Sequence, residues 1–106
     1  MTYTNHSIAL PETLNQAVIA LSHGKAGDNL NNILSEYPAA TNIAAAVERH
    51  LKYPVIDSSP VKRRSYWLDP RRVQALRAYA LTTYVPFDSL LRILVQDHFS
   101  QQGPQQ

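Results

Sequence analysis

A short basic segment, residues 62–68, constrains the fold of this chain more than any other feature. Its sequence, KRRSYWL, has the alternation and the β-prone residues of a strand. Asp69-Pro70 follows at once, and this pair is typical of a helix start, with aspartate as the N-cap and proline in the first turn. A lone strand leaves its backbone hydrogen-bonding groups unpaired. The segment therefore needs a partner strand, either from elsewhere in the chain or from a second copy of it.

Two helices are predicted after this strand. The first carries an apolar stripe of Val73, Leu76 and Ala80. The second opens after Val85-Pro86 and carries a wider stripe that comprises Phe87, Leu90, Leu91, Leu94, Val95, His98 and Phe99. One strand and two helices cannot enclose so wide a stripe. The core therefore also requires a second copy of this unit.

The first half of the chain offers a candidate for that copy. Residues 8–14 (IALPETL) resemble residues 66–73 (YWLDPRRV), because both have an apolar alternation and a proline that opens a helix. Further along, residues 37–51 align without gaps on residues 85–99. Together the two matches require an insertion in the first copy, between positions 24 and 34.

A second version of the repeat has no insertion and uses residues 18–21 as the first strand and residues 26–37 as the first helix. We prefer the version with the insertion, because Leu10-Pro11-Glu12 is the better junction between a strand and a helix. The predicted boundaries are a degenerate N-terminal half with an inserted helix (1–51), a linker (52–61), a C-terminal strand-helix-helix unit (62–100) and a disordered tail (101–106).

Charge is distributed unevenly along the chain. Residues 1–61 carry three basic and five acidic side chains, whereas residues 62–106 carry seven basic and three acidic ones. Six of those seven basic residues lie between Lys62 and Arg77. Such a local concentration of positive charge is typical of a surface that binds a polyanion, although a solvated basic surface has the same pattern.

Several classes of function lack support in the sequence. There is no cysteine, so neither a disulfide nor a thiolate metal site is expected. The histidines do not have the spacing of a helical ligand pair and carboxylates are few, so we expect no metal, no cofactor and no enzyme activity. No segment approaches the roughly 18 apolar residues of a membrane span, and the first residues do not resemble a signal peptide. The expected location is cytoplasmic.

Residues 62–99 resemble the ribbon-helix-helix family of small DNA-binding proteins, which includes the Arc and methionine repressors. The resemblance rests on the basic strand, the Leu68-Asp69-Pro70 junction and the two helices, and it covers residues 7–51 only loosely. It implies a mainly α fold in which a short antiparallel β-ribbon lies over a helical core, formed by a homodimer or by one chain as a pseudo-dimer. The implied function is sequence-specific binding of double-stranded DNA in the major groove, by a small transcriptional regulator such as a repressor or by an accessory protein of a plasmid or mobile element.

The resemblance also implies roles for individual residues. With Tyr66 and Leu68 facing the core, strand alternation turns Arg63, Ser65 and Trp67 outward, where they are expected to read DNA bases. The expected phosphate contacts are Lys62, Arg64, Arg71 and Arg72. The orientation of Trp67 stays open, because a lone tryptophan often packs inward.

Two features depart from the family pattern. The second helix opens with Val85-Pro86-Phe87-Asp88, where proline removes an N–H donor and Asp88 adds negative charge, so a phosphate is expected to bind weakly there. The first strand is expected to show Asn5, Ser7 and Ala9 on its outer side, a set that offers little for base reading. These features support a second interpretation, a helical protein-interaction module such as an antitoxin-like or adaptor protein, which docks on an acidic partner without reading DNA.

Overall fold

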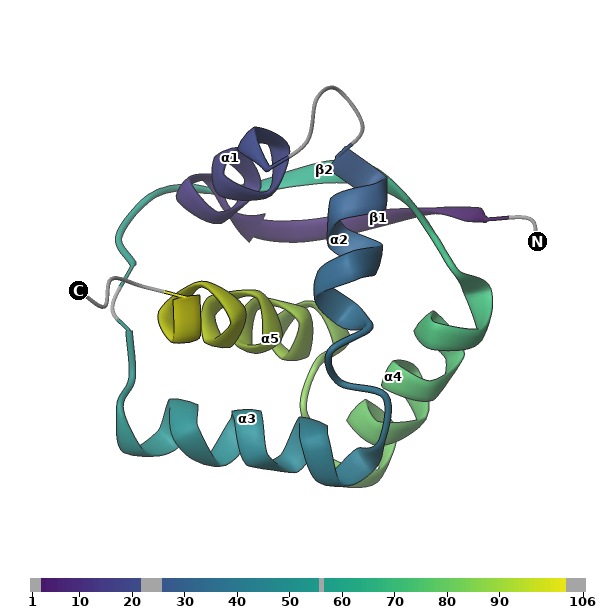
Figure 1. Ribbon diagram of the computed structural model, residues 1–106, viewed down its shortest axis with the longest axis vertical. Helices are drawn as coiled ribbons and strands as arrows, with labels where there is room; N and C mark the ends of the chain where they lie inside the picture. The colour runs from purple at the N-terminus through teal and green to yellow at the C-terminus, as the bar shows by residue number, and fades with distance from the viewer. Residues whose placement is uncertain (1–2, 22–25, 56, 103–106) are drawn as a thin grey trace.

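Five helices and a two-stranded antiparallel sheet make up the described part of the chain (Figure 1). The computed structural model describes residues 3–21, 26–55 and 57–102. In chain order the elements are β1 (Thr4–Pro11), α1 (Glu12–Ala20), α2 (Ala26–Leu34), α3 (Ala40–Lys52), β2 (Val61–Leu68), α4 (Pro70–Thr83) and α5 (Phe87–Gln102). None of these helices is long and apolar enough to cross a membrane.

The basic strand β2 finds its partner within the same chain, because it pairs antiparallel with β1. Ser7 lies opposite Ser65 near the middle of the ribbon, and Thr4 lies opposite Leu68 at one end. The predicted need for a second strand is thus confirmed. The strand β1 covers eight residues, Thr4–Pro11.

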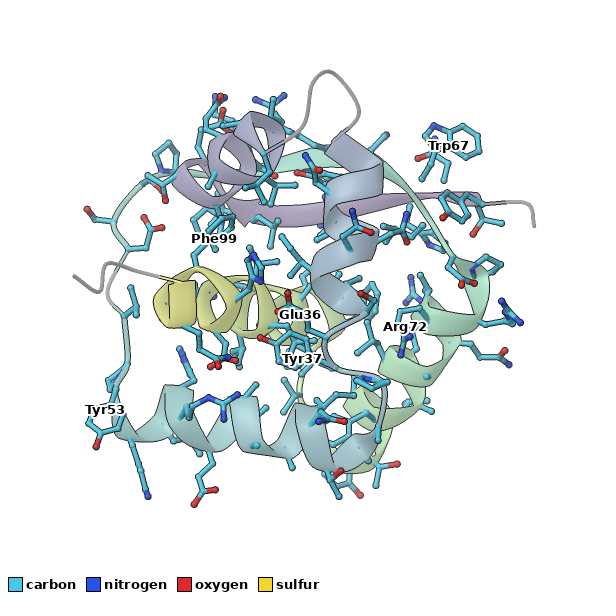
Figure 2. The ribbon with its side chains drawn as sticks, viewed as in Figure 1. Glu36, Tyr37, Tyr53, Trp67, Arg72 and Phe99 are labelled. Carbon is cyan, nitrogen blue, oxygen red and sulfur yellow. The ribbon has the colours of Figure 1, made fainter. Side chains whose placement is uncertain are left out.

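Side-chain alternation gives the ribbon one buried and one exposed face. Ile8 and Leu10 of β1 are fully buried. Leu68 of β2 is also fully buried, and Tyr66 is 2% exposed. The side chain of Trp67, between these two, is 57% exposed and points away from the helices (Figure 2). The inner face of the ribbon therefore forms part of the core, and the orientation left open for the tryptophan is outward.

The two strands lead into their helices in different ways. Asp69 caps α4 as expected, since its carboxylate accepts a hydrogen bond from the backbone N–H of Arg71 at 2.9 Å and Pro70 is the first helical residue. Pro11, expected inside the first turn of its helix, is instead the last residue of β1, and α1 begins at Glu12. The sheet holds Pro11 extended, because it lies opposite Val61 at the end of the register.

The central helix of the fold is α5, which contacts α1, α2, α3, α4 and β1. The buried apolar side chains of its middle turns are Leu90, Leu91, Ile93, Leu94 and Val95. Neighbours on several sides explain why its apolar stripe is so wide. The helix continues to Gln102, so the first two residues of the expected disordered tail are helical, whereas residues 103–106 lie outside the described residues.

The order strand, helix, helix occurs twice, as β1-α1-α2 and as β2-α4-α5, and the two sets pack on each other reciprocally. The helix α2 packs against β2, α5 packs against β1, and α2 and α5 pack against each other. The sequence repeat made α3 the counterpart of α5. In the structure the counterpart of α5 is α2, which packs against the opposite strand, whereas α3 packs mainly on α5. The two aligned prolines, Pro38 and Pro86, mark only where helices start. They do not show which helices are equivalent, so the repeat matched the wrong helix to α5. The version with a strand over residues 18–21 is also wrong, because residues 18–20 are helical.

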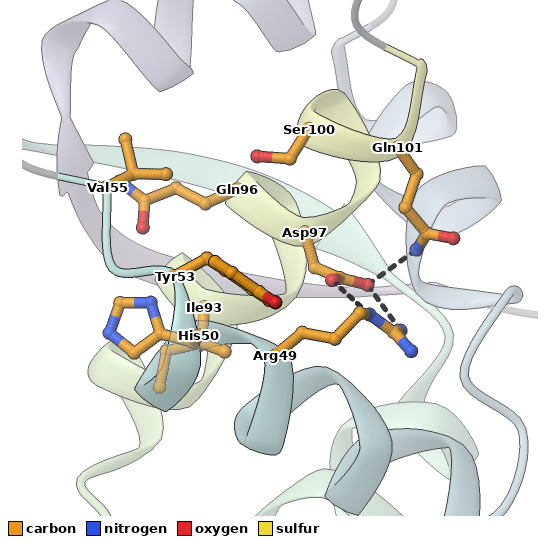
Figure 3. A pocket seen from close by; sticks show the side chains of 9 residues that line it. All are labelled: Arg49, His50, Tyr53, Val55, Ile93, Gln96, Asp97, Ser100 and Gln101. Atoms are coloured by element: carbon orange, nitrogen blue, oxygen red, sulfur yellow. Dashed lines mark hydrogen bonds and ion pairs between the residues drawn. The ribbon is translucent and has the colours of Figure 1, made fainter.

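A partly buried polar network joins α3 to α5 (Figure 3). Nε and Nη2 of Arg49 each donate to a carboxylate oxygen of Asp97 at 2.8 Å, and the hydroxyl of Tyr37 donates to the same carboxylate at 2.7 Å. Burial by itself raises the pKa of Asp97, but the hydrogen bonds from Arg49 and Tyr37 outweigh it and hold this pKa below its usual value. Asp97 is therefore ionised at neutral pH and joins the segment after α2 to α3 and α5.

Candidate nucleic-acid interface

The exposed face of the ribbon consists of three cross-strand pairs. These are Asn5 opposite Trp67, Ser7 opposite Ser65, and Ala9 opposite Arg63. All but the half-buried Ala9 are exposed. The three residues predicted to read bases, all on β2, therefore lie together on one open surface, and β1 contributes the small polar residues beside them.

Arg63 lies across the ribbon and contacts both β1 and α5. Its Nη1 donates to the backbone carbonyl of Ser7 at 3.2 Å, and its Nη2 lies 3.5 Å from Oδ2 of Asp88. Both contacts are long, and the side chain remains 58% exposed. An exposed ion pair of this kind contributes about 1 kcal/mol or less, so the guanidinium can exchange it for a better acceptor.

The backbone beside Trp67 is held by a single residue of α2. Nδ2 of Asn31 donates to the carbonyl of Trp67 at 2.9 Å, and the N–H of Asp69 donates to Oδ1 of Asn31 at the same distance. The end of β2 is therefore fixed while the indole ring stays outside. Sequence reasoning missed Asn31, because nothing local marks which asparagine of a polar helix reaches another strand.

A second asparagine supports the ribbon from its inner side. Asn15 of α1 is fully buried, and its Nδ2 donates to the carbonyls of Leu10 and Lys62, both at 3.2 Å. The hydroxyl of Tyr66 donates to Oδ1 of Asn15 at 2.5 Å. Burial raises the pKa of Tyr66, so this hydroxyl stays protonated as a donor. Sequence reasoning missed this contact as well, although an asparagine between the buried apolar residues Leu14 and Val18 is a signal that could have found it.

Two of the four predicted phosphate-binding residues carry accessible charge. Lys62 is exposed on β2 and forms no ion pair with the described residues. Arg71, at the start of α4, has a side chain that is 75% exposed and lies 3.6 Å from Oδ1 of the capping Asp69. Both side chains are exposed beside the ribbon, where a polyanion can approach them.

The other two predicted phosphate-binding residues already hold partners. Arg64 donates to Glu12 at 2.7 Å, and this bond, with a further one from Gln16, holds the pKa of Glu12 at about 2. The positive charge of Arg64 is therefore largely neutralised at physiological pH. Arg72 is partly buried between α4 and the segment that follows α2, with its Nη1 3.5 Å from the carbonyl of Tyr37 (Figure 2). Its side chain turns toward the helices.

The first turn of α5 presents a carboxylate to the ribbon. Oδ1 of Asp88 accepts a hydrogen bond from the backbone N–H of Ala9 at 3.2 Å, while its Oδ2 faces Arg63. This geometry gives Asp88 a structural role at the edge of β1. It also places negative charge where a helix N-terminus otherwise attracts an anion.

Neither a metal site nor a known relative adds to this description. In the three described stretches, no group of three or more His, Asp or Glu side chains is placed to hold a metal ion. No protein-family model matches the chain, and searches of curated proteins and of solved structures found no match.

Proposed function

We propose that this chain is a single-chain ribbon-helix-helix pseudo-dimer that binds double-stranded DNA through the exposed face of its β1-β2 ribbon. The observation that carries the proposal is the common exposed face of Arg63, Ser65 and Trp67 on an antiparallel ribbon. The reciprocal packing of β1-α1-α2 on β2-α4-α5 supports it, because two copies of a strand-helix-helix unit pack in this way.

The dimensions and chemistry of the ribbon suit the major groove of DNA. That groove is about 12 Å wide and admits a two-stranded ribbon. Arg63 has the planar donor fork that pairs with O6 and N7 of guanine, and Ser65 can bond several bases. The ring of Trp67 offers an apolar surface for a thymine methyl group or a sugar edge. Base reading is thus assigned to β2.

Phosphate contacts are assigned to the cations at the margins of the ribbon. Lys62 and Arg71 are exposed, and Arg64 can exchange Glu12 for a phosphate. Each contact that releases a counterion steepens the salt dependence of binding. A regulator of transcription or an accessory protein of a plasmid or mobile element is the corresponding biological role.

The test begins with selection of a preferred duplex from a random library, followed by fluorescence anisotropy titrations between 50 and 200 mM salt. We expect Lys62→Ala to weaken binding to every duplex and to reduce the salt slope by about 1. Arg63→Ala is expected to cost about 1–3 kcal/mol on the selected duplex and to relax sequence preference. Lys52→Ala, which removes an exposed lysine of α3, is the charge-matched control and should change little.

Two results contradict the proposal. One is the absence of duplex binding even at 50 mM salt, and the other is an equal effect of Lys52→Ala and Lys62→Ala. Sedimentation equilibrium of the same samples tests the pseudo-dimer, for which we expect the mass of one chain, 11.9 kDa. A stable dimer in the absence of DNA contradicts an internal ribbon as the complete reading unit.

The alternative is a protein-interaction module that docks on an acidic partner. It is favoured by the carboxylates beside Arg63 and Arg64 and by the lack of a cation on the outer side of β1. Affinity capture with and without nuclease separates the two functions. A partner that survives nuclease treatment, combined with the absence of duplex affinity, supports the alternative and contradicts DNA reading.

A further inference from the structure

The β1-β2 ribbon has a local two-fold axis, as the backbone of any antiparallel pair of strands does. With the axis at the pair of Ser7 and Ser65, each residue of β1 is related to the residue of β2 that lies 58 positions later, as Ser65 follows Ser7. The same axis relates Glu12 to Pro70, which are the first residues of α1 and α4. The strands and the starts of their helices therefore occupy equivalent places, and the two halves differ there in their side chains.

The outer faces of the two strands carry different groups at equivalent positions. Arg63 is 58% exposed, and its counterpart on β1 is Asn5, which is short and uncharged. Trp67 is 57% exposed and points away from the helices (Figure 2), and its counterpart is the half-buried Ala9. A half-turn about the axis therefore replaces a guanidinium by an amide and an indole by a methyl group.

The other cations of the ribbon have no charged counterparts either. Lys62 is related to Thr4, and Arg64 is related to His6. Burial and, to a smaller extent, the charge of Arg77 lower the pKa of His6, so this imidazole is uncharged at neutral pH. Within the ribbon, positive charge at neutral pH therefore lies on β2 alone.

Arg63 and Trp67 lie on opposite sides of the axis and so face different parts of a duplex. They are four residues apart on an extended strand, a span of about 13 Å. This span corresponds to about four base pairs at the 3.4 Å spacing of B-DNA. A guanidinium pairs with O6 and N7 of guanine, whereas an apolar surface suits the methyl group of thymine. One end of the ribbon therefore favours a G·C pair, and the other end favours an A·T pair.

We propose that a single chain reads a non-palindromic DNA site in one orientation, with guanine at the Arg63 end of the ribbon and thymine at the Trp67 end. This inference rests on the proposed DNA binding and adds the symmetry of the site. Reversing the chain on the same duplex puts Asn5 in the place of Arg63, and the lost pair with guanine corresponds to about 5- to 150-fold in affinity. A ribbon of two identical strands instead selects a palindrome, because both halves of its site meet the same side chains.

The first test analyses duplexes that the full chain selects from a random library. We expect one motif with a G·C pair in one half and an A·T pair in the other. Arg63→Ala should abolish the preference in the G·C half only, and Trp67→Ala should abolish it in the A·T half only, so each variant is the control for the other. A palindromic motif, or a variant that alters both halves equally, overturns the inference.

The second test measures the orientation of the bound chain. The sequence has no cysteine, so a single introduced cysteine can carry an iron-EDTA group that cleaves nearby DNA. Val61→Cys and Thr4→Cys place this group on exposed residues at opposite ends of the ribbon. We expect the Val61→Cys conjugate to cut the flank beside the guanine and the Thr4→Cys conjugate to cut the other flank. Lys52→Cys on α3 is the control and should give no localised cleavage.

The possible failures are distinguishable. Equal cleavage of both flanks by each ribbon conjugate shows that the chain binds in two orientations, which overturns the inference but leaves DNA binding by the ribbon intact. The absence of any selected duplex at low salt contradicts the proposed function, and this inference with it.

Discussion

The two strands of the ribbon are alike on one face and different on the other. Their inner faces present Ile8 and Leu10 from β1 and Tyr66 and Leu68 from β2, all buried in the same core. Their outer faces present Asn5, Ser7 and Ala9 from β1, but Arg63, Ser65 and Trp67 from β2. Packing constrains the inner face of both strands, because each buried apolar side chain contributes to the core. Packing does not explain an arginine and a tryptophan in solvent, and this is why we propose the outer face of β2 as a binding surface.

The second helix of each half shows a related difference. The helix α2 has nine residues, whereas α5 has sixteen and also packs against α3. The added turns of α5 carry Asp97, which anchors α3 through Arg49. The strand-helix-helix arrangement therefore occurs twice in the chain, and the additional helix α3 packs on α5, the longer of the two second helices.

The largest expected effect concerns the shared inner face. Leu10→Ala and Leu68→Ala each remove a fully buried side chain, so each should lower the free energy of unfolding by about 2–5 kcal/mol. Ser7→Ala and Ser65→Ala are the outer-face controls and should stay within about 0.5 kcal/mol of the original chain. Urea denaturation provides the measurement. A large loss in only one strand contradicts the equivalence of the two inner faces.

The next effect concerns the anchor between α3 and the longer half. Asp97→Asn weakens the bonds from Arg49 and Tyr37, and it should lower the free energy of unfolding at neutral pH by about 1–3 kcal/mol. Hydrogen exchange should increase most in α3, while the amides of the ribbon change little. A uniform increase across all helices contradicts the view that α3 is an addition to the duplicated fold.

The same residue gives a pH dependence. The pKa of Asp97 is lower in the folded chain than its usual value, so its stabilising contribution is complete above about pH 4 and is lost as the pH falls through the folded pKa. The stability of the original chain should therefore fall more steeply on acidification than that of Asp97→Asn. Parallel curves contradict an ionised Asp97 at this anchor.

A smaller effect comes from making the outer faces alike. Asn5 precedes Ser7 by two residues as Arg63 precedes Ser65, so Asn5→Arg places an arginine at the position on β1 related to Arg63. We expect duplex affinity at low salt to rise about 3–10-fold, because one more cation faces the phosphates. Asn5→Gln, which adds length without charge, is the control. An unchanged affinity for the arginine variant means that β1 does not approach DNA.

The smallest effect concerns the carboxylate beside Arg63. Asp88→Asn keeps an oxygen that can accept from the N–H of Ala9 but removes the negative charge, so stability should change little and duplex affinity should rise about 2–5-fold. Glu48→Gln removes an exposed carboxylate of α3 and serves as the control in the same anisotropy assay. If the two variants change duplex affinity equally, the proximity of Asp88 to Arg63 does not affect DNA binding.

Much of the local structure was predictable from short sequence signals. The cap at Asp69-Pro70, the alternation that buries Tyr66 and Leu68, and the stripe of α5 follow from rules that act within a few residues. The pairing of α2 with α5 was not predictable in this way. Several amphipathic helices compete for the same apolar surface, and their sequence spacing does not say which one reaches it.

By itself, the sequence determined that residues 62–68 form a basic strand and that this strand requires a partner, because alternation and backbone hydrogen bonding are local properties. Tertiary structure decided that the partner is β1, that Asn31 and Asn15 fix the ribbon, and that Glu12 and Asp88 lie beside its arginines. The physical reason is distance along the chain. The strand pairs join residues 50 to 64 positions apart, and these side-chain contacts join residues 25 to 52 positions apart, so only the packing of the whole core brings them together.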